Sequence, residues 1–201
     1  RPHRSLDQQA PDNGEIAARF KVAFARQERI DNQRQLATSE QRELDRWRQI
    51  ITDVISDVPS TEELFRELWQ HFASPQGWRI FPDVPACWQA ISRAGCIVGV
   101  ASNFDVRLRA VCRSQPLLES CQHLFISSEI GARKPTPAFF AAVQRQLNLQ
   151  PNQILLVGDD RDADYHGARA AGWQALLLDR SGKASGPDII HSLDEVPTRL
   201  L

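Results

Sequence analysis

Two clusters of polar residues in the second half of the chain could bind an anion. Ser102 and Asn103 supply a hydroxyl and an amide directly after a short apolar run, although both residue types could equally cap a helix. Lys134 stands between Arg133 and Pro135 and is one of three lysines among 24 basic residues. Because arginine is used so heavily elsewhere, a lysine here indicates that a compact point charge is needed.

A third cluster is acidic and could bind a cation. Four aspartates occur within six residues, directly after an apolar run and a glycine: Asp159, Asp160, Asp162 and Asp164. Oxygen ligands of this density suit Mg²⁺, which takes one or two carboxylates and completes its shell with water and phosphate oxygens. Asp160 or Asp162 could instead cap the following helix. A hydroxyl, an ammonium group and a metal-binding acidic pair together match the needs of phosphoryl transfer, which depends on positioning and charge neutralisation.

The elements that must position these clusters lie after residue 78. Short apolar runs with little alternation are typical of strands buried on both faces of a parallel sheet. The predicted strands cover residues 96–101, 123–127, 154–157 and 175–178. Helical spacing separates them, and the predicted helices cover residues 84–94, 106–116, 137–147 and 162–171. The alternation predicts an open, Rossmann-like α/β fold, whose ligands bind beyond the carboxyl ends of the strands.

The front of the chain follows a different pattern. Residues 1–14 are polar and aperiodic, and we expect a loop or a frayed end there. Residues 15–78 carry apolar side chains at helical spacing, which predicts an all-helical segment. Residues 79–201 then form the α/β segment.

Composition limits the function classes. The net charge of −1 argues against nucleic acid and anionic membranes as partners, and no apolar run approaches the roughly 20 residues that span a bilayer. The cysteines form no CxxC pair, so we expect buried, reduced thiols in a cytoplasmic protein. A small molecule or a protein is the expected partner. The four cysteines are Cys87, Cys96, Cys112 and Cys121.

The order of the polar clusters resembles the haloacid dehalogenase-like (HAD) hydrolase superfamily, in its branch with a helical cap. Residues 102–105 resemble its second motif, residues 132–140 its third motif with the helix that follows, and residues 158–164 its fourth. The resemblance is continuous over residues 79–201, and residues 187–196 show the closing pattern of the family.

The resemblance implies a role for each motif residue. Ser102 would hydrogen-bond the transferring phosphoryl group, helped by the Asn103 backbone, and Lys134 would neutralise charge on the nucleophile and the phosphoryl oxygens. Asp159 would ligate Mg²⁺, with Asp164 as its second acidic partner. The helical segment would be the cap that selects a small phosphorylated metabolite.

The first motif of the family is missing from this sequence. In the family an aspartate at the tip of the central strand, in a D-x-D-x-T type motif, forms an aspartyl-phosphate. No D-x-D precedes the helical segment here, and Asp7, Asp12 and Glu15 do not follow an apolar strand. Without that strand its neighbours lose backbone hydrogen bonds worth about 1–3 kcal/mol for each buried group. We therefore expect a fragment of a longer protein, or one that recruits a substitute strand, and the absence of Met agrees with a truncated front.

Other functions remain possible beside a Mg²⁺-dependent phosphatase. A catalytically dead HAD-like interaction or regulatory module would keep the fold and lack the nucleophile. A signalling receiver domain uses the same residue types, but its acidic pair comes first in the chain, whereas here the order is Ser102, Lys134, Asp159. Dehalogenase chemistry is disfavoured, because displacement at carbon does not need the metal-binding carboxylates Asp159 and Asp160.

Overall fold

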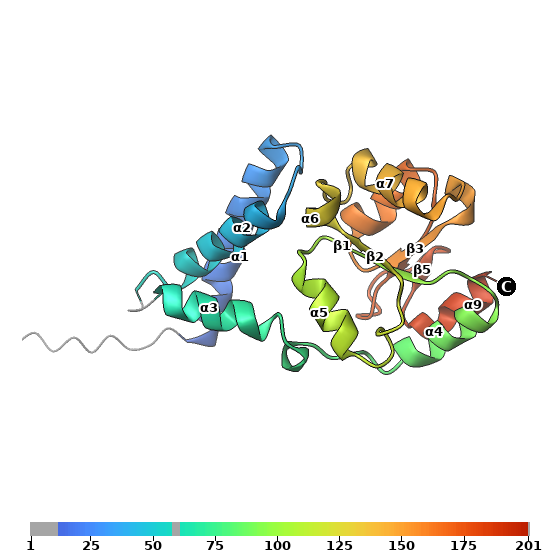
Figure 1. Ribbon diagram of the computed structural model, residues 1–201, viewed down its shortest axis with the longest axis horizontal. Coiled ribbons are helices and arrows are strands. Elements are labelled where there is room, and N and C mark those ends of the chain that lie inside the picture. The colour runs from blue at the N-terminus through green and yellow to red at the C-terminus, as the bar shows by residue number, and fades with distance from the viewer. Residues whose placement is uncertain (1–11, 58–60, 201) are drawn as a thin grey trace, which may run out of the picture.

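The computed structural model describes residues 12–57 and 61–200, and it separates a helical part from an α/β part (Figure 1). The helical part contains α1 (Asn13–Gln33), α2 (Glu40–Val54) and α3 (Thr61–His71). Helix α1 begins at Asn13, two residues earlier than expected, because the Asp12 side chain accepts a hydrogen bond from the Glu15 amide at 2.8 Å. The rest of the loop expected over residues 1–14 lies outside the described residues.

Helices α1 and α2 pack against each other through an apolar contact. Its buried side chains are Ala23, Ile50, Val54 and Ile55. Elsewhere along the pair the interface carries buried charged groups, which are described below. None of the helices in the described ranges is long and apolar enough to cross a bilayer.

Within residues 79–200, which the structure describes, the α/β part contains five parallel strands in two sheets. Strand β1 (Gly99–Ser102) pairs with β2 (His123–Ile126), and β4 (Gln174–Leu178) pairs with both β3 (Leu155–Gly158) and β5 (Ile189–Ile190). In Figure 1 the strands lie between α7 on one side and α4, α5 and α9 on the other, so an α/β fold with parallel strands is confirmed.

Helices connect the strands of this part in sequence order. The α-helices are α4 (Val84–Arg93), α5 (Arg107–Ser114), α6 (Ser127–Ile130), α7 (Pro137–Leu147), α8 (Gly167–Ala170) and α9 (Val196–Leu200). Residues Arg161–His166 form a turn of π-helix, where the sequence predicts regular α-helix. The short 3₁₀ turns are Pro75–Gly77, Pro151–Gln153 and Leu193–Glu195.

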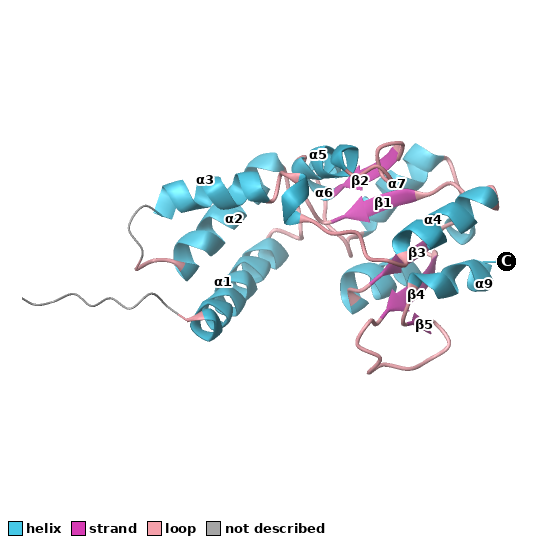
Figure 2. Cartoon of the chain, turned by 90° about the horizontal axis from the view of Figure 1, so that it is seen from below, coloured by secondary structure: helices cyan, strands magenta, loops and turns pink. Residues whose placement is uncertain are grey.

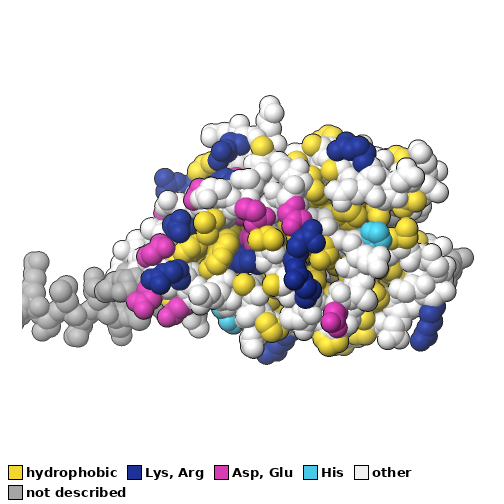
Figure 3. All heavy atoms as spheres, viewed as in Figure 1, with side chains coloured by type: hydrophobic (Ala, Val, Ile, Leu, Met, Phe, Trp, Pro, Cys, Tyr) yellow, Lys and Arg dark blue, Asp and Glu magenta, His cyan; other side chains and the backbone are white. Residues whose placement is uncertain are grey.

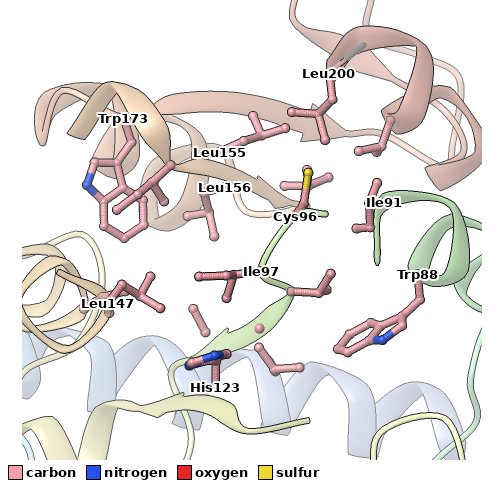
Figure 4. A pocket seen from close by; sticks show the side chains of 18 of the residues that line it. Trp88, Ile91, Cys96, Ile97, His123, Leu147, Leu155, Leu156, Trp173 and Leu200 are labelled. Carbon is pink, nitrogen blue, oxygen red and sulfur yellow. The ribbon is translucent and has the colours of Figure 1, made fainter. Parts of the chain in front are cut away.

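An apolar cavity lies between the two sheets. It has a volume of about 630 Å³, and both β1 and β3 line it together with Trp88, Leu147 and Trp173 (Figure 4). Within the described residues, β1 has only β2 as a strand partner and β3 has only β4. Figure 2 shows β1 and β2 set apart from β3, β4 and β5. The cavity between the two sheets lies where the family resemblance places a central strand, and we call it the inter-sheet slot.

The open slot explains two departures from the sequence prediction. Strand β1 begins at Gly99 rather than residue 96, and Cys96 and Ile97, which line the slot, are exposed. The expectation of buried thiols is therefore wrong for Cys96. Cys121 is partly buried, whereas Cys87 and Cys112 are buried as expected. All four thiols are free. Strand β5 was not predicted, because two residues carry no periodicity.

The start of α4 is tied to the C-terminal segment through Asp83. Its carboxylate accepts hydrogen bonds from Arg180 Nη1 at 2.7 Å and from the Leu193 amide at 2.9 Å. These bonds, the one from Arg180 first, lower the pKa of Asp83 to about 2.

We expect Asp83→Asn to lower the stability at pH 7. The pKa of Asp83 is lower in the folded chain than in the unfolded chain, where it is near 4, so the ionised carboxylate stabilises the fold at pH values above 4. This contribution is lost as the pH falls towards 2. The difference between the variant and the original chain should therefore shrink as the pH falls from 4 towards 2. Urea unfolding at pH 7, 5 and 3 measures it, with Asp45→Asn, at an exposed site on α2, as a control that should follow the original chain.

Candidate active site

Lys134 occupies the centre of the candidate site. The side chain is buried, and its Nζ atom donates hydrogen bonds to Asp164 Oδ1 at 2.5 Å and to the Ala101 carbonyl at 2.9 Å. Ala101 belongs to β1, whereas Asp164 follows the tip of β3. The ammonium group therefore bridges the carboxyl ends of two strands that lie on either side of the inter-sheet slot.

Asn103 holds the backbone of Lys134 in place. Its Oδ1 atom accepts a hydrogen bond from the Lys134 amide at 2.8 Å, and its Nδ2 atom donates one to the Lys134 carbonyl at 3.0 Å. The family resemblance implies phosphate binding by the Asn103 backbone, and the structure adds this separate use of the side chain. The sequence gives no sign that the Asn103 side chain pairs with the Lys134 backbone, because 31 residues separate Asn103 from Lys134.

Ser102 is the last residue of β1 and is half-buried. Its backbone is fixed by parallel pairing, in register with Ile126. Among the described residues its hydroxyl forms no hydrogen bond, which leaves the group available at the same strand end as Asn103.

Asp164 approaches the β3 tip closely because Gly158 has no side chain. Asp164 is buried, and its Oδ2 atom accepts a hydrogen bond from the Asp160 amide at 3.2 Å. A Cβ atom on Gly158 would lie 2.1 Å from Asp164 Oδ2, well inside van der Waals contact. Glycine at this position therefore allows the carboxylate to reach Lys134.

We expect Gly158→Ala to displace the Asp164 carboxylate and to lower stability by about 1–3 kcal/mol, the usual cost of overpacking. Urea unfolding would measure the loss. Gly14→Ala is a suitable control, because Gly14 is exposed near the start of α1 and an added Cβ would lie 3.1 Å from the carboxylate of the N-cap residue Asp12, a contact that a small movement relieves. Equal, small effects of both substitutions would contradict this account of Gly158.

The remaining aspartates of the acidic cluster have different environments. Asp160 caps the π-turn, because its Oδ1 atom accepts hydrogen bonds from the amides of Asp162 at 2.9 Å and Ala163 at 2.8 Å. Asp159 and Asp162 are exposed. Asp159 lines a shallow hollow with Arg161 and residues 177–179 and 183–184.

The magnesium ligands predicted from the sequence, Asp159 and Asp164, both follow this strand end. The described residues contain no group of three or more His, Cys, Asp and Glu side chains that could hold a metal. Mg²⁺ nevertheless commonly uses only one or two carboxylates and keeps water and phosphate oxygens in its other positions. Asp159 is exposed directly after β3, whereas Asp164 is buried and paired with Lys134, so a metal ion bound there would share the Asp164 carboxylate with that ammonium group.

The surface around the helical part carries charges of both signs. On the face shown in Figure 3, acidic and basic side chains are interleaved and do not gather into an extended patch of one sign. The view agrees with the near-zero net charge, and this face lacks the extended basic surface that binds a polyanion.

Comparison with known proteins gives one family. A family model described as haloacid dehalogenase-like hydrolase matches residues 6–172. Haloacid dehalogenase-like hydrolase domain-containing protein 3 of Danio rerio is 29% identical over 165 residues, which cover 77% of this chain and 68% of that protein. Phosphatase MT3486 of Mycobacterium tuberculosis is 33% identical over 124 residues, covering 61% of this chain and 54% of the relative. The chain spans about half the length of the related bovine, frog and human proteins.

A solved structure shows the same fold. The HAD-hydrolase YfnB from Bacillus subtilis, described as putative and bound to magnesium, superposes with a TM-score of 0.75 and 17% identity. The superposition covers 96% of this chain and 86% of that one.

Proposed function

This chain belongs to the haloacid dehalogenase-like hydrolase family, and we propose that its parent protein hydrolyses small phosphate monoesters with the help of Mg²⁺. The observation that carries the proposal is the Lys134–Asp164 pair at the strand ends, 2.5 Å apart and next to Ser102. This pair brings a buried ammonium group to the place where ligands of open α/β sheets bind.

Each site residue has a role in this proposal. The Ser102 hydroxyl donates a hydrogen bond to a phosphoryl oxygen, and Lys134 Nζ neutralises negative charge as it develops there. The side chain of Asn103 holds the backbone of Lys134 in place, and the backbone N–H of Asn103 donates to the phosphoryl group. Asp159 and Asp164 would hold Mg²⁺, which supplies further charge neutralisation when bound.

The nucleophile would be supplied by a strand in the inter-sheet slot. In a reaction of this family, an aspartate carboxylate attacks phosphorus, the substrate oxygen leaves as the alcohol after protonation, and water then cleaves the aspartyl-phosphate. The slot supports this proposal, since both neighbouring strands line it and their tips carry Ser102 and Gly158.

We further propose that residues 15–78 act as a cap over the site. The turn between α1 and α2 contacts the Lys134 loop through two backbone hydrogen bonds, from Arg133 to the Leu36 carbonyl and from Thr38 to the Gly131 carbonyl, both at 3.1 Å. A helical segment that docks beside the strand ends can exclude water and select the substrate.

A catalytically dead interaction or regulatory module is the second candidate. This candidate rests on the described carboxylates, none of which lines the slot. A module would keep the fold and leave phosphoryl chemistry unused.

A phosphate-ester panel with the parent protein separates the two candidates. We expect turnover that requires Mg²⁺ and is lost in Lys134→Ala. Arg145→Ala is the control, because Arg145 is an exposed cation on α7 that lines neither the slot nor the hollow beside Asp159, and it should retain activity. Absence of turnover across the panel, with folding intact, would favour the module.

A further inference from the structure

A buried ionic cluster joins the α1–α2 pair to the residue that precedes Lys134. Its centre is Asp31 in α1, whose side chain is almost fully buried. Three arginines surround this carboxylate: Arg42 Nε donates to Oδ1 at 2.7 Å, Arg46 Nε lies 3.0 Å from Oδ2, and Arg133 Nη1 donates to Oδ2 at 2.8 Å.

Arg133 links two segments that are far apart in the sequence. It lies 102 residues from Asp31 and is itself buried. Its second nitrogen, Nη2, donates to Glu28 Oε1 at 3.0 Å. A guanidinium held by two carboxylates in this way has little freedom to move, and so restrains the backbone to which it is attached.

Two of the three arginines that pair with Asp31, Arg42 and Arg46, come from α2. Arg46 also pairs with Glu28 and Glu43, so three carboxylates share the three guanidinium groups of the cluster. The pKa of Arg46 is lowered, first by the burial of Arg46 itself and then by the positive charge of Arg133. The third guanidinium therefore disfavours the charged form of Arg46. Of the three arginines, Arg133 is the one that comes from the α/β part, so its contacts serve to connect the two parts.

This connection ends next to Lys134. Asn103 holds the Lys134 backbone from the β1 side, and the Arg133–Asp31 pair holds the preceding residue from the helical side. Because Lys134 Nζ reaches both Asp164 and Ala101, a small shift of its backbone would break at least one of these bonds.

We propose that Arg133 and Asp31 are positioning residues that make the placement of the Lys134 ammonium group depend on docking of the α1–α2 pair. The proposal deepens the proposed function and rests on it for the catalytic meaning of Lys134. The coupling itself is a property of the chain that can be measured without substrate.

The ¹⁵N spectrum of lysine Nζ groups provides the test, because the chain has only three lysines. The Lys134 signal is assigned by its loss in Lys134→Arg. In Arg133→Met we expect it to shift or to broaden beyond detection, as the ammonium group loses its fixed contacts. Asp31→Asn should change the signal in the same direction, and Arg133→Lys, which keeps the charge, should change it less.

Arg42→Met is the matched control. It removes a guanidinium that bonds to Asp31 and Gln27 but does not touch the Lys134 loop, and so should leave the Lys134 signal in place. Backbone amide spectra of each variant verify that the chain remains folded.

Two results would overturn the proposal. One is an unchanged Lys134 signal in folded Arg133→Met and Asp31→Asn. The other is an equal change in Arg42→Met, which would assign the cluster to general stability. A parent protein without phosphatase activity would refute the proposed function but leave the coupling to be decided by the lysine spectra.

Discussion

The 201-residue chain, purified by itself, is expected to hydrolyse an aryl phosphate such as p-nitrophenyl phosphate no faster than the buffer does, with or without Mg²⁺. The described site offers a hydroxyl, an ammonium group and carboxylates, but none of its carboxylates lies in the slot between β1 and β3. Removal of a covalent nucleophile costs on the order of 10⁶-fold in kcat, and the remaining groups cannot compensate for it.

The parent protein, assayed in parallel, serves as the positive control for this expectation. Its Mg²⁺-dependent turnover should be lost in Lys134→Ala. If the 201-residue chain showed Mg²⁺-dependent turnover of its own, and Lys134→Ala abolished it, a nucleophile would exist within this sequence and the role proposed for the slot would be wrong.

The secondary structure was most predictable where periodicity and local end signals agree. Helix α7 begins at Pro137 and ends at Leu147, as predicted, because proline is favoured in the first turn and Asn148 adopts the left-handed conformation that ends the helix. Strands β2 and β3 lie within one residue of their predicted bounds, since buried parallel strands read as short continuous apolar runs.

The placement of the site residues at the strand ends followed from the topology, but their contacts did not. A parallel α/β fold places the carboxyl ends of its strands on one side, so the neighbourhood of Lys134 could be anticipated, although β1 and β3 belong to separate sheets within the described residues. Its bond to Asp164 depends on the absence of a side chain at Gly158 and on the path of the π-turn, neither of which has a periodic signal.

The link between Arg133 and Asp31 had no sequence signal at all. Asp31 occupies a helical position where an acidic residue is normally a solvated surface group, and charged residues are almost never fully buried unless they are paired. Only tertiary docking brings the three guanidinium groups to it. Asp105 is similar, because the sequence grouped it with the second motif whereas the structure buries it in a bidentate pair with Arg107.

Lys134→Met is expected to destabilise the chain as well as inactivate the parent protein. The substitution leaves Asp164 buried without its cation, and breaking a buried pair in this way costs about 3–5 kcal/mol. We expect a value near the lower end, about 3 kcal/mol, because the Asp160 amide still donates to Asp164. Urea unfolding of the chain at pH 7 measures the change without any assay of activity.

The double variant Lys134→Met/Asp164→Leu distinguishes loss of a contact from burial of an unpaired charge. Replacing both members of a buried pair with apolar groups is often neutral or stabilising, so the double variant should recover most of the stability that Lys134→Met loses. Arg109→Met, which breaks the exposed pair with Glu129, is the control and should cost no more than about 1 kcal/mol. A double variant as unstable as Lys134→Met would show that Lys134 stabilises the fold through its bond to the Ala101 carbonyl instead of through Asp164. If the double variant regained stability but the parent protein carrying it remained inactive, the Lys134–Asp164 pair would be needed for the reaction and not for folding.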